Sequence, residues 1–573
     1  MRLYALRYKA WYGWGLLALL ATNSLSVAIP AYLENAMSSV DPVLGDGKVD
    51  HWVAMIFGAA VGLIVVRTAS RMLIFVPGRE AEAAIRYDYF RHLMRLQPPF
   101  YRRMQLGDLL SRGSNDIQFV RVLVGFAGLQ VLNLAFSLPL NLFMMSQISG
   151  WLTFGCVLPM LASLWVMRYG VRAMMVHMLA AQEDLSALSG EVLESYNGVR
   201  VVESYGARDA MLKRFDARNI TYVDHLVSIA FVRSFLLPFV RVIGNVGVLI
   251  LLYVGGTMVA EEKLHFGAVS AFSVYLTNIV GSLTALGWVI NIIQRGQISL
   301  RRILEVLQTS PELPPVTAEL PKGPLDLELR DLTFAYAGDD TDPVLSNISI
   351  TVPAGTTLGL FGATGSGKTT LLRLLARLED GPPGSLLVGG VDLRSVPLGD
   401  LRDAMAVVTQ RPYLFSRSLR ENVAFGGGEA PVGTGSDSAV MQALDRAALA
   451  GDLDALPDGL DTVVGERGVT LSGGQRQRAA LARAFYRPSR ILLLDDTLSA
   501  VDTDTEQQLI EAIYDVEVPR TTVMVSHRVS ALKHAEQIVV LAEGRVLQRG
   551  THTELLARGG PYADAWSEEE DAE

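Results

Sequence analysis

Long apolar runs fill the first half of the chain, and short alternating patterns fill the second half. Before residue 300, six apolar runs are each long enough to cross the hydrocarbon core of a bilayer. They cover residues 11–36, 52–76, 121–147, 151–172, 233–258 and 266–292. After about residue 325, short strand-like runs alternate with helical periodicity, which is typical of a soluble α/β domain. The pattern predicts an all-α membrane domain with six spans, followed by a soluble α/β domain.

A proline-rich segment separates the two patterns. Thr309–Pro315 carries Pro311, Pro314 and Pro315, and further prolines follow it. Proline and glycine clusters between periodic segments mark loops and linkers. We therefore expect a transmembrane domain over residues 1–310, a linker over 311–324 and a soluble domain over 325–573.

The distribution of basic residues predicts the orientation in the membrane. The loops around Asp41 to Asp50 and around Glu261–Lys263 are short and mostly acidic, whereas the opposite loops carry many arginines. Cytoplasmic loops of membrane proteins carry an excess of Lys and Arg. Both termini are then expected in the cytoplasm. The preference for arginine over lysine and the high content of Ala, Leu and Gly suggest a GC-rich bacterial genome. Together with the six spans, this predicts a multi-pass protein of a bacterial cell (inner) membrane.

Composition excludes some functions. The 573 residues have a formal net charge of −9, and no basic stripe alternates with aromatic residues, which argues against nucleic-acid binding. Half of the residues are hydrophobic, and the mean hydropathy is +0.29. Cys156 is the single cysteine and lies in an apolar run, so the sequence predicts neither a disulfide framework nor a cysteine metal cluster.

A glycine-rich motif in the second half predicts nucleotide binding. Residues 362–369 fit G-x-x-x-x-G-K-[ST], follow the strand-like run 357–361 and precede the helical run 371–375. In this context, backbone N–H groups and the helix N-terminus cradle phosphates, and the hydroxyl of Thr369 is placed for Mg²⁺. The predicted ATP-binding residues are Gly362, Ala363, Thr364, Gly365, Ser366, Gly367, Lys368, Thr369 and Thr370.

A second motif selects a family. Leu471-Ser472-Gly473-Gly474-Gln475 precedes a helical run and resembles the signature loop of ABC transporters. Physically it is another helix N-terminus able to bind phosphate. In that family the signature acts on ATP held by the opposite nucleotide-binding domain. The resemblance implies that Ser472, Gly473, Gly474 and Gln475 bind ATP across a dimer of two chains.

Other matches follow in the order of the same family. The resemblance implies that Tyr336 stacks on adenine, that Gln410 contacts Mg²⁺ and that Asp495 is the Mg²⁺-directed Walker B carboxylate. Ser499–Asp502 resembles the loop that crosses the dimer seam, and His527 resembles the switch histidine at the γ-phosphate. These matches cover residues 325 to 550.

One position departs from the family pattern. Asp496 follows Asp495 where the family normally has the glutamate that polarises the attacking water. A carboxylate shorter by one methylene is withdrawn by about one bond length, and a misplacement of ~1 Å can cost on the order of 100-fold in rate. We therefore expect a slow ATP site in this chain. A partner with a glutamate would hydrolyse ATP, and its site would be completed by the signature of this chain.

The architecture resembles that of exporter half-transporters. Six spans precede one ATPase domain, and residues 99–112 and 194–202 resemble the coupling regions of ABC exporters, in long cytoplasmic helical loops. The chain is most similar to the degenerate-site subunit of bacterial heterodimeric multidrug or peptide exporters. A homodimeric exporter is one alternative, and an ATP-binding regulatory subunit that does not pump is another. The expected partners are a second half-transporter, the lipid bilayer and a small-molecule, lipid or peptide substrate.

Arginines in the apolar runs suggest where substrate binds. Arg233 and Arg241 are eight residues apart with Pro238 between them, so they could share one face of the fifth span and bind an anionic or peptide carboxyl group. Snorkelling to the lipid headgroups is the simpler interpretation for Arg67, Arg71 and Arg233. The sequence leaves the choice among drug, lipid and peptide substrates open.

Overall fold

The computed structural model describes residues 7–40, 47–310, 318–336, 342–427, 436–465, 471–499, 501–514 and 519–571. Side chains are described throughout these ranges except at residues 163–164, 237, 240–241, 244 and 283–288. Residues 311–317 of the predicted linker therefore lie outside the described residues, as does the side chain of Arg241.

The chain divides into two compact units. The first joins Met1–Met94 to Leu106–Thr309, and the second joins Arg95–Gln105 to Ser310–Glu573. The short segment Arg95–Gln105 thus packs with the C-terminal part of the chain, although it lies within the first 310 residues. It contains the helix α4 (Pro98–Arg103), which begins with two prolines at positions where a missing backbone N–H costs nothing.

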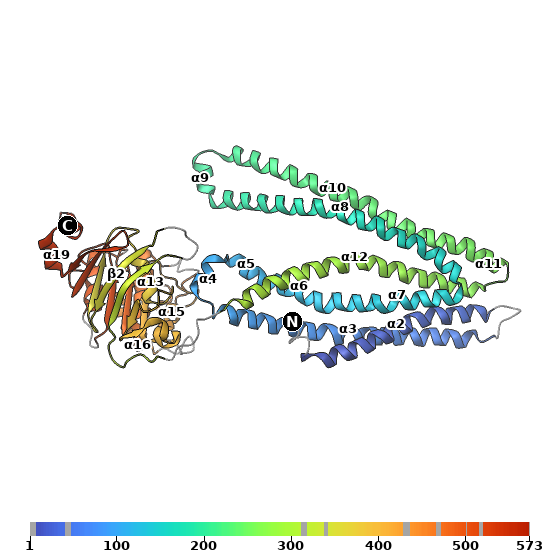
Figure 1. The fold of residues 1–573 in the computed structure, drawn as a ribbon, viewed down its shortest axis with the longest axis horizontal. Coiled ribbons are helices and arrows are strands. Elements are labelled where there is room, and N and C mark those ends of the chain that lie inside the picture. Colours follow the sequence, from blue (N-terminus) through green and yellow to red (C-terminus); the bar gives the residue numbers. More distant parts are fainter. Residues whose placement is uncertain are drawn as a thin grey trace. The chain divides into compact units, whose positions relative to one another are not determined.

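The first unit is built from long helices (Figure 1). Among the described residues, three π-helical turns interrupt them. Its elements are α2 (Lys9–Ser38), α3 (Val49–Leu93), α5 (Leu106–Ser111), η1 (Arg112–Asp116), α6 (Ile117–Val122), η2 (Leu123–Ala127), α7 (Gly128–Ile148), α8 (Gly150–Asn197), α9 (Val199–Ser204), α10 (Arg208–Ile250), η3 (Leu251–Gly255), α11 (Gly256–Ala260) and α12 (Phe266–Gln308). Helix α2 packs along α3, and α8 packs along α10. Helix α12 contacts both α2 and α7.

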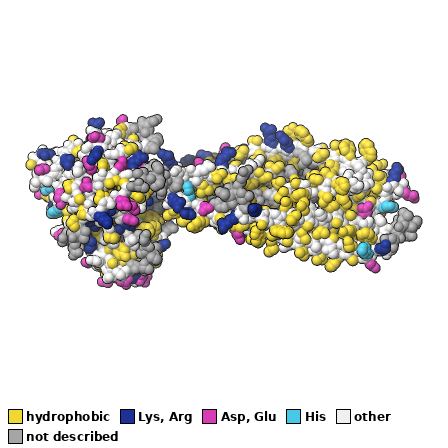
Figure 2. All heavy atoms as spheres, turned by 60° about the horizontal axis from the view of Figure 1, so that its bottom comes forward, with side chains coloured by type: hydrophobic (Ala, Val, Ile, Leu, Met, Phe, Trp, Pro, Cys, Tyr) yellow, Lys and Arg dark blue, Asp and Glu magenta, His cyan; other side chains and the backbone are white. Residues whose placement is uncertain are grey.

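Apolar side chains cover much of the outside of this helical unit (Figure 2). Phe57 is 72% exposed and Trp151 is 86% exposed, which is stable only in an apolar environment or against a partner. Within the described residues, 4 stretches are long and apolar enough to cross a membrane: Lys9–Ser38, Val49–Leu93, Leu106–Ile148 and Gly150–Asn197. Shorter apolar stretches cover Asn245–Ala260 and Phe266–Ser282, which overlap the fifth and sixth predicted spans.

The second unit holds two sheets. One has the strand order β2-β1-β4-β5 and is antiparallel, and the other has the order β10-β9-β3-β8-β7-β6. The strands are β1 (Leu327–Phe334), β2 (Leu345–Val352), β3 (Thr357–Phe361), β4 (Leu386–Val388), β5 (Val391–Asp392), β6 (Met405–Val408), β7 (Ile491–Asp495), β8 (Thr521–Val525), β9 (Gln537–Ala542) and β10 (Arg545–Gly550). In the larger sheet, β9, β3, β8, β7 and β6 are parallel neighbours.

Helices connect and cover these strands. They are α13 (Lys368–Leu375), α14 (Leu398–Ala404), α15 (Leu419–Ala424), α16 (Asp437–Arg446), α17 (Gly473–Tyr486), α18 (Thr503–Tyr514), α19 (His552–Arg558) and α20 (Pro561–Glu570). Short 3₁₀ turns are η4 (Leu393–Ser395), η5 (Phe425–Gly427), η6 (Ala450–Ala455) and η7 (Gly459–Asp461).

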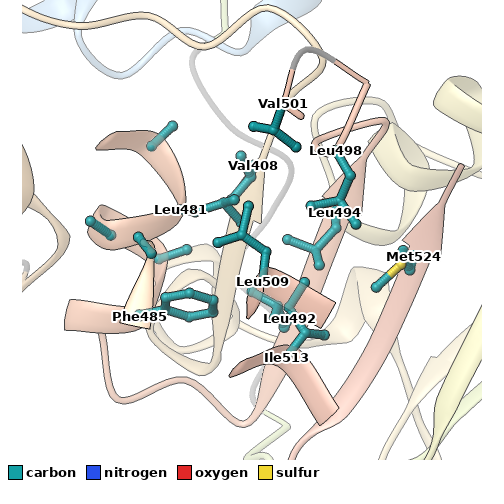
Figure 3. Close-up of a cluster of buried hydrophobic side chains, with 14 of the residues drawn as sticks. Val408, Leu481, Phe485, Leu492, Leu494, Leu498, Val501, Leu509, Ile513 and Met524 are labelled. Atoms are coloured by element: carbon teal, nitrogen blue, oxygen red, sulfur yellow. The ribbon is translucent and has the colours of Figure 1, made fainter. Parts of the chain in front are cut away.

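One hydrophobic cluster fixes α17 against the parallel sheet (Figure 3). Leu481 and Phe485 of α17 lie with Leu492 and Leu494 of β7 in this buried cluster. Burying one such side chain contributes ~1.5–3 kcal/mol relative to its exposure. The predicted signature, which begins α17, and the predicted Walker B carboxylate, which ends β7, are therefore joined by a shared core. The cluster also includes Val408, Leu498, Val501, Leu509, Ile513 and Met524.

Candidate functional site

The residues predicted to bind ATP and Mg²⁺ gather at one edge of the larger sheet. The loop 362–369 follows β3, Asp495 ends β7, and His527 lies just after β8, which pairs with both strands. Gln410 lies two residues after β6, the other neighbour of β7. Because parallel strands end at the same edge of a sheet, ligands bind outside their carboxyl ends. The sheet order thus brings together motifs that are far apart in sequence.

Two glycines shape the loop after β3. Gly362 has φ +147°, and a Cβ there would lie only 2.2 Å from the carbonyl oxygen of Leu541. Gly367 has φ +98° immediately before α13, where a Cβ would lie 2.5 Å from Leu345. Both the backbone conformation and the space therefore require glycine. The loop turns the chain so that α13 begins at Lys368. The first N–H groups of an α-helix have no partner within the helix, which favours an anion there.

Lys368 is folded back onto this loop. Its Nζ donates to the carbonyl oxygens of Gly362 at 2.6 Å and Ala363 at 2.8 Å. Burial lowers the pKa of Lys368, and the nearby carboxylates of Asp496 and Asp495 partly oppose that shift. An ammonium group has three donors and no acceptor, so phosphate oxygens can take the place of these carbonyls.

Asp495 and Thr369 form a pair of oxygen ligands. The hydroxyl of Thr369 donates to Oδ1 of Asp495 at 3.1 Å. Burial raises the pKa of Asp495, and the hydrogen bond from Thr369 offsets part of this rise. Hydroxyl and carboxylate oxygens are the ligands that Mg²⁺ prefers. The two groups fit a Mg²⁺ that is also bound to nucleotide phosphates.

Asp496 is held by its backbone and by a neighbouring amide. Its φ is +48°, a left-handed conformation that short polar residues tolerate better than most others. Its N–H donates to the carbonyl oxygen of Val525 at 3.0 Å, and its carboxylate accepts a hydrogen bond from Nε2 of Gln410 at 3.1 Å. Only 7% of Asp496 is exposed. The sequence did not predict this pairing of Gln410 with Asp496.

Tyr336 lies two residues beyond β1 and is linked to α13. Its hydroxyl is 3.0 Å from the Oγ1 of Thr370, which fixes the ring beside the phosphate loop. The guanidinium of Arg102, in α4, lies 4.6 Å from the centre of the ring. Arg102 also pairs with the buried Glu379 at 2.7 Å. Sequence reasoning missed Arg102 and Glu379. The one available signal was that residues 99–112 resemble a coupling region.

The signature residues form the N-terminal cap of α17. The Oγ of Ser472 accepts from the N–H of Gln475 at 3.2 Å, and the side chain of Gln475 accepts from the N–H of Ser472 at 2.9 Å. Nε2 of Gln475 also donates to Asp452 at 2.9 Å. Ser472 and Gly473 are exposed, so the start of α17 is open to an anion from outside the described chain.

The predicted arginine pair in the fifth span is only partly described. Arg233, in α10, has an exposed side chain. The side chain of Arg241 lies outside the described residues. Their predicted role in a substrate cavity stays a prediction. A cavity does lie elsewhere in the helical unit, next to Arg67 and Arg71.

Comparison with known proteins decides the family. Residues 12–283 match the ABC transporter transmembrane region, and residues 345–499 match the ABC transporter family. The chain is 35% identical to YheI of Bacillus subtilis, described as a probable multidrug resistance ABC transporter ATP-binding/permease protein, over 99% of this chain and 96% of that one. This chain belongs to the ABC transporter family. The exporter is also 31% identical to the ATP-dependent lipid A-core flippase of Yersinia pestis, over 94% of each chain.

A solved structure matches nearly the whole length of the chain. The exporter aligns with a bacterial Atm1-family ABC exporter with ATP bound, at a TM-score of 0.82 and 25% identity, over 97% of this chain and 98% of the other. The predicted fold class, a transmembrane helical domain followed by an α/β ATPase domain, is confirmed. The chain is accordingly a membrane-embedded, ATP-hydrolysing translocase that binds ATP through its ABC ATPase domain.

Proposed function

We propose that this chain is one subunit of a heterodimeric ABC exporter and that its own ATP site hydrolyses slowly. The observation that carries the proposal is Asp496, which stands next to the Asp495 that ends β7, where the family normally has glutamate. The other groups assigned to ATP binding keep the residue types of the family pattern. Lys368 is buried at the phosphate loop, and Thr369 faces Asp495.

Geometry explains why the site would be slow. A general base must approach within roughly 2.6–3.2 Å of the group whose proton it takes. Asp496 is one methylene shorter than glutamate, and its carboxylate already accepts a hydrogen bond from Gln410 at 3.1 Å. That hydrogen bond keeps the carboxylate oriented toward the amide. Both effects act on the attacking water and leave ATP binding intact.

Mg²⁺ would bind at the same edge of the sheet. Thr369 and Asp495 supply a hydroxyl and a carboxylate, and Gln410 supplies an amide oxygen. When bound, the ion neutralises charge on the phosphates of ATP. His527, which is exposed after β8, would contact the γ-phosphate. These side chains hold and orient the nucleotide whether or not Asp496 activates water.

The signature of this chain would serve the partner. Ser472 and Gly473 are exposed at the N-terminus of α17, a 14-residue helix whose dipole favours an anion there. The capping box of Ser472 and Gln475 fixes the start of the helix before any nucleotide arrives. A chain that keeps the signature but has Asp496 at the position of the base fits a subunit that completes its partner's active site.

The proposed cargo moves outward across a bacterial inner membrane by alternating access, with both termini in the cytoplasm. The arginine-rich loops support this orientation. The relatives are named for multidrug resistance and for flipping the lipid A core, so drug-like and lipid substrates come first, and peptides remain a third class.

Co-purification with a second half-transporter encoded by a neighbouring gene tests the proposal. We expect the chain alone to turn over ATP slowly and the pair to turn over ATP rapidly. Replacing the partner's catalytic glutamate by glutamine should abolish that turnover, whereas Asp496→Asn should change it little. A homodimer with rapid turnover that Asp496→Asn abolishes would overturn the proposal. ATP-dependent accumulation of substrate in inside-out vesicles separates a transporter from a regulatory subunit.

A further inference from the structure

We propose that the helical unit binds an anionic group of its substrate in a polar cavity beside Arg67 and Arg71. This inference rests on the proposed export function and adds the chemical class of the cargo. The cavity has a volume of ≈ 460 Å³, within the range of ordinary ligand sites. Its walls come from four helices: α2, α3, α7 and α12.

Two unpaired cations face this space. Arg67 and Arg71 are four residues apart on α3, so they lie on one face of that helix. Among the described residues, neither guanidinium forms an ion pair or a hydrogen bond, and no Asp or Glu lines the cavity. Ionisable residues within membrane spans are costly and usually face a cavity or a partner. The cavity therefore carries positive charge that its own walls leave uncompensated.

Neutral polar groups complete the walls. Asn23 of α2 donates to the side-chain oxygen of Asn133 of α7 at 3.1 Å, which ties two walls together. Ser70 of α3 donates to the carbonyl oxygen of Gly15 at 3.3 Å. On α12, Asn278 donates to Asn141 of α7 at 3.3 Å. The walls are thus joined by hydrogen bonds between helices before a ligand enters, which lowers the entropy cost of binding.

This chemistry selects a ligand by charge. A guanidinium presents a planar fork of donors that matches a carboxylate or a phosphate with two parallel hydrogen bonds. Amide and hydroxyl side chains such as Gln130 and Ser282 can add neutral donors. A cationic amphiphile would meet two like charges and no carboxylate. The cavity therefore favours a carboxylate- or phosphate-bearing ligand over a cationic drug.

The simplest expectation from sequence places Arg67 and Arg71 among lipid headgroups, and this stays a prediction. Both residues are exposed, and both line the cavity. The same ligand chemistry could come from an anionic lipid headgroup or from a soluble organic anion. Binding measurements must therefore use one ligand of each kind.

The test measures binding to the full exporter, with its partner, in nucleotide-free nanodiscs. Fluorescence anisotropy would report labelled phosphatidylglycerol against labelled phosphatidylcholine, and carboxyfluorescein against the cation ethidium. Arg67→Gln with Arg71→Gln should weaken binding of the anionic ligand at least about tenfold, since each lost charged hydrogen bond is worth about that factor. Arg67→Lys with Arg71→Lys keeps the charge but not the planar fork, so it should lose less affinity than the double glutamine variant.

A matched control lies on α8. Arg168 and Arg172 have the same spacing, are exposed and do not line the cavity, so Arg168→Gln with Arg172→Gln should leave binding unchanged. Loss of phosphatidylglycerol binding identifies a lipid ligand, and loss of carboxyfluorescein binding identifies a soluble one. Anion binding that survives the Arg67 and Arg71 double glutamine variant, or equal binding of ethidium, overturns the inference. Because no nucleotide is present, this result is independent of which ATP site hydrolyses.

Discussion

The side-chain amide of Gln410 donates a hydrogen bond of 3.1 Å to the carboxylate of Asp496. The two residues follow adjacent parallel strands, β6 and β7. Family resemblance gives Gln410 a role at Mg²⁺ and gives position 496 the role of the base. The bond uses Nε2 of Gln410 and one carboxylate oxygen of Asp496, so it fixes how both side chains are turned. The amide oxygen that Gln410 would offer to Mg²⁺ is a different atom from the Nε2 that holds Asp496.

Lengthening the carboxylate should accelerate hydrolysis at this site. We expect Asp496→Glu to raise single-turnover ATP cleavage in this chain's site by roughly 10–100-fold, since a shift of ~1 Å at the reacting group has effects of that order. Asp495→Asn in the same background should remove the gain, because Mg²⁺ loses its carboxylate. An unchanged rate for Asp496→Glu would show that the left-handed backbone at this position, with φ +48°, limits the base.

Arg102 should compete with adenine for the Tyr336 ring. Its guanidinium lies 4.6 Å from the ring centre, a cation–π distance worth ~0.5–1 kcal/mol at exposed sites. Arg102→Ala is expected to strengthen ATP binding by roughly 2–5-fold, as that energy no longer opposes stacking. Arg103→Ala, next to it and exposed, is the control and should leave affinity unchanged. Titration with a fluorescent ATP analogue measures both, and weaker binding in Arg102→Ala would show that Arg102 supports the ring.

Glu379 should make the stability of the second unit depend on mildly acidic pH. Burial raises the pKa of Glu379, and Arg102 and Arg373 offset only part of that rise. A folded-state pKa above the unfolded one means that the folded chain holds the proton more tightly. The contribution to stability is then fully present below the ordinary pKa and is lost as pH rises through the raised one.

The measurement is the difference in melting temperature between the wild type and Glu379→Gln, followed from about pH 4 to about pH 6, which spans the ordinary pKa of glutamate. The wild type should lose stability relative to the variant as the pH rises. A difference that changes in the opposite direction would mean that the 2.7 Å ion pair with Arg102 outweighs burial.

Arg112 should be a structural centre of the helical unit. Its side chain is 8% exposed and donates to Asp108 at 2.8 Å and to Glu305 at 2.7 Å. It also donates to the backbone oxygen of Arg302 at 2.7 Å, which joins η1 to α12. Arg112→Ala should destabilise the unit by ~1.5–3 kcal/mol, the usual value for a hydrogen bond to a charged group.

An exposed ion pair provides the comparison. Arg86 is 53% exposed and pairs with Glu82 at 2.8 Å. Arg86→Ala should cost less than ~1 kcal/mol, because exposed pairs are weak. Thermal unfolding in detergent should therefore show a clear loss for Arg112→Ala and a small one for Arg86→Ala. Equal losses would contradict the role assigned to Arg112.

The sequence predicts the ATP site better than it predicts the contacts around it. Loop 362–369, Gln410 and His527 each follow a strand, and Asp495 ends one, so these residues meet at one sheet edge once the strands are parallel neighbours. The link between Gln410 and Asp496 depends on β6 lying beside β7, which no local pattern reveals.

Longer-range contacts escape sequence reasoning for the same reason. Arg102 meets Tyr336 and Glu379 across more than two hundred residues, and only packing brings them together. Arg67 and Arg71 show the limit for the membrane domain. Their spacing fixes a shared helix face, but whether that face meets lipid or a cavity depends on how α3 packs against its neighbours.

Ser472 should affect the partner's ATP site more than its own. Its Oγ caps α17, and loss of such a cap costs ~0.5–2 kcal/mol. Thr551 caps α19 in a capping box of the same kind. Thr551→Ala therefore removes an equivalent cap at a position far from the signature in sequence. We expect Ser472→Ala and Thr551→Ala to lower the melting temperature similarly.

Only Ser472→Ala should reduce ATP hydrolysis by the heterodimer, because the missing hydroxyl also leaves the partner's nucleotide without a donor. Ser472→Thr keeps the hydroxyl and should retain most of the activity. If Thr551→Ala reduced hydrolysis as strongly as Ser472→Ala, the effect would come from stability, and the exposed start of α17 would have no special role across the dimer.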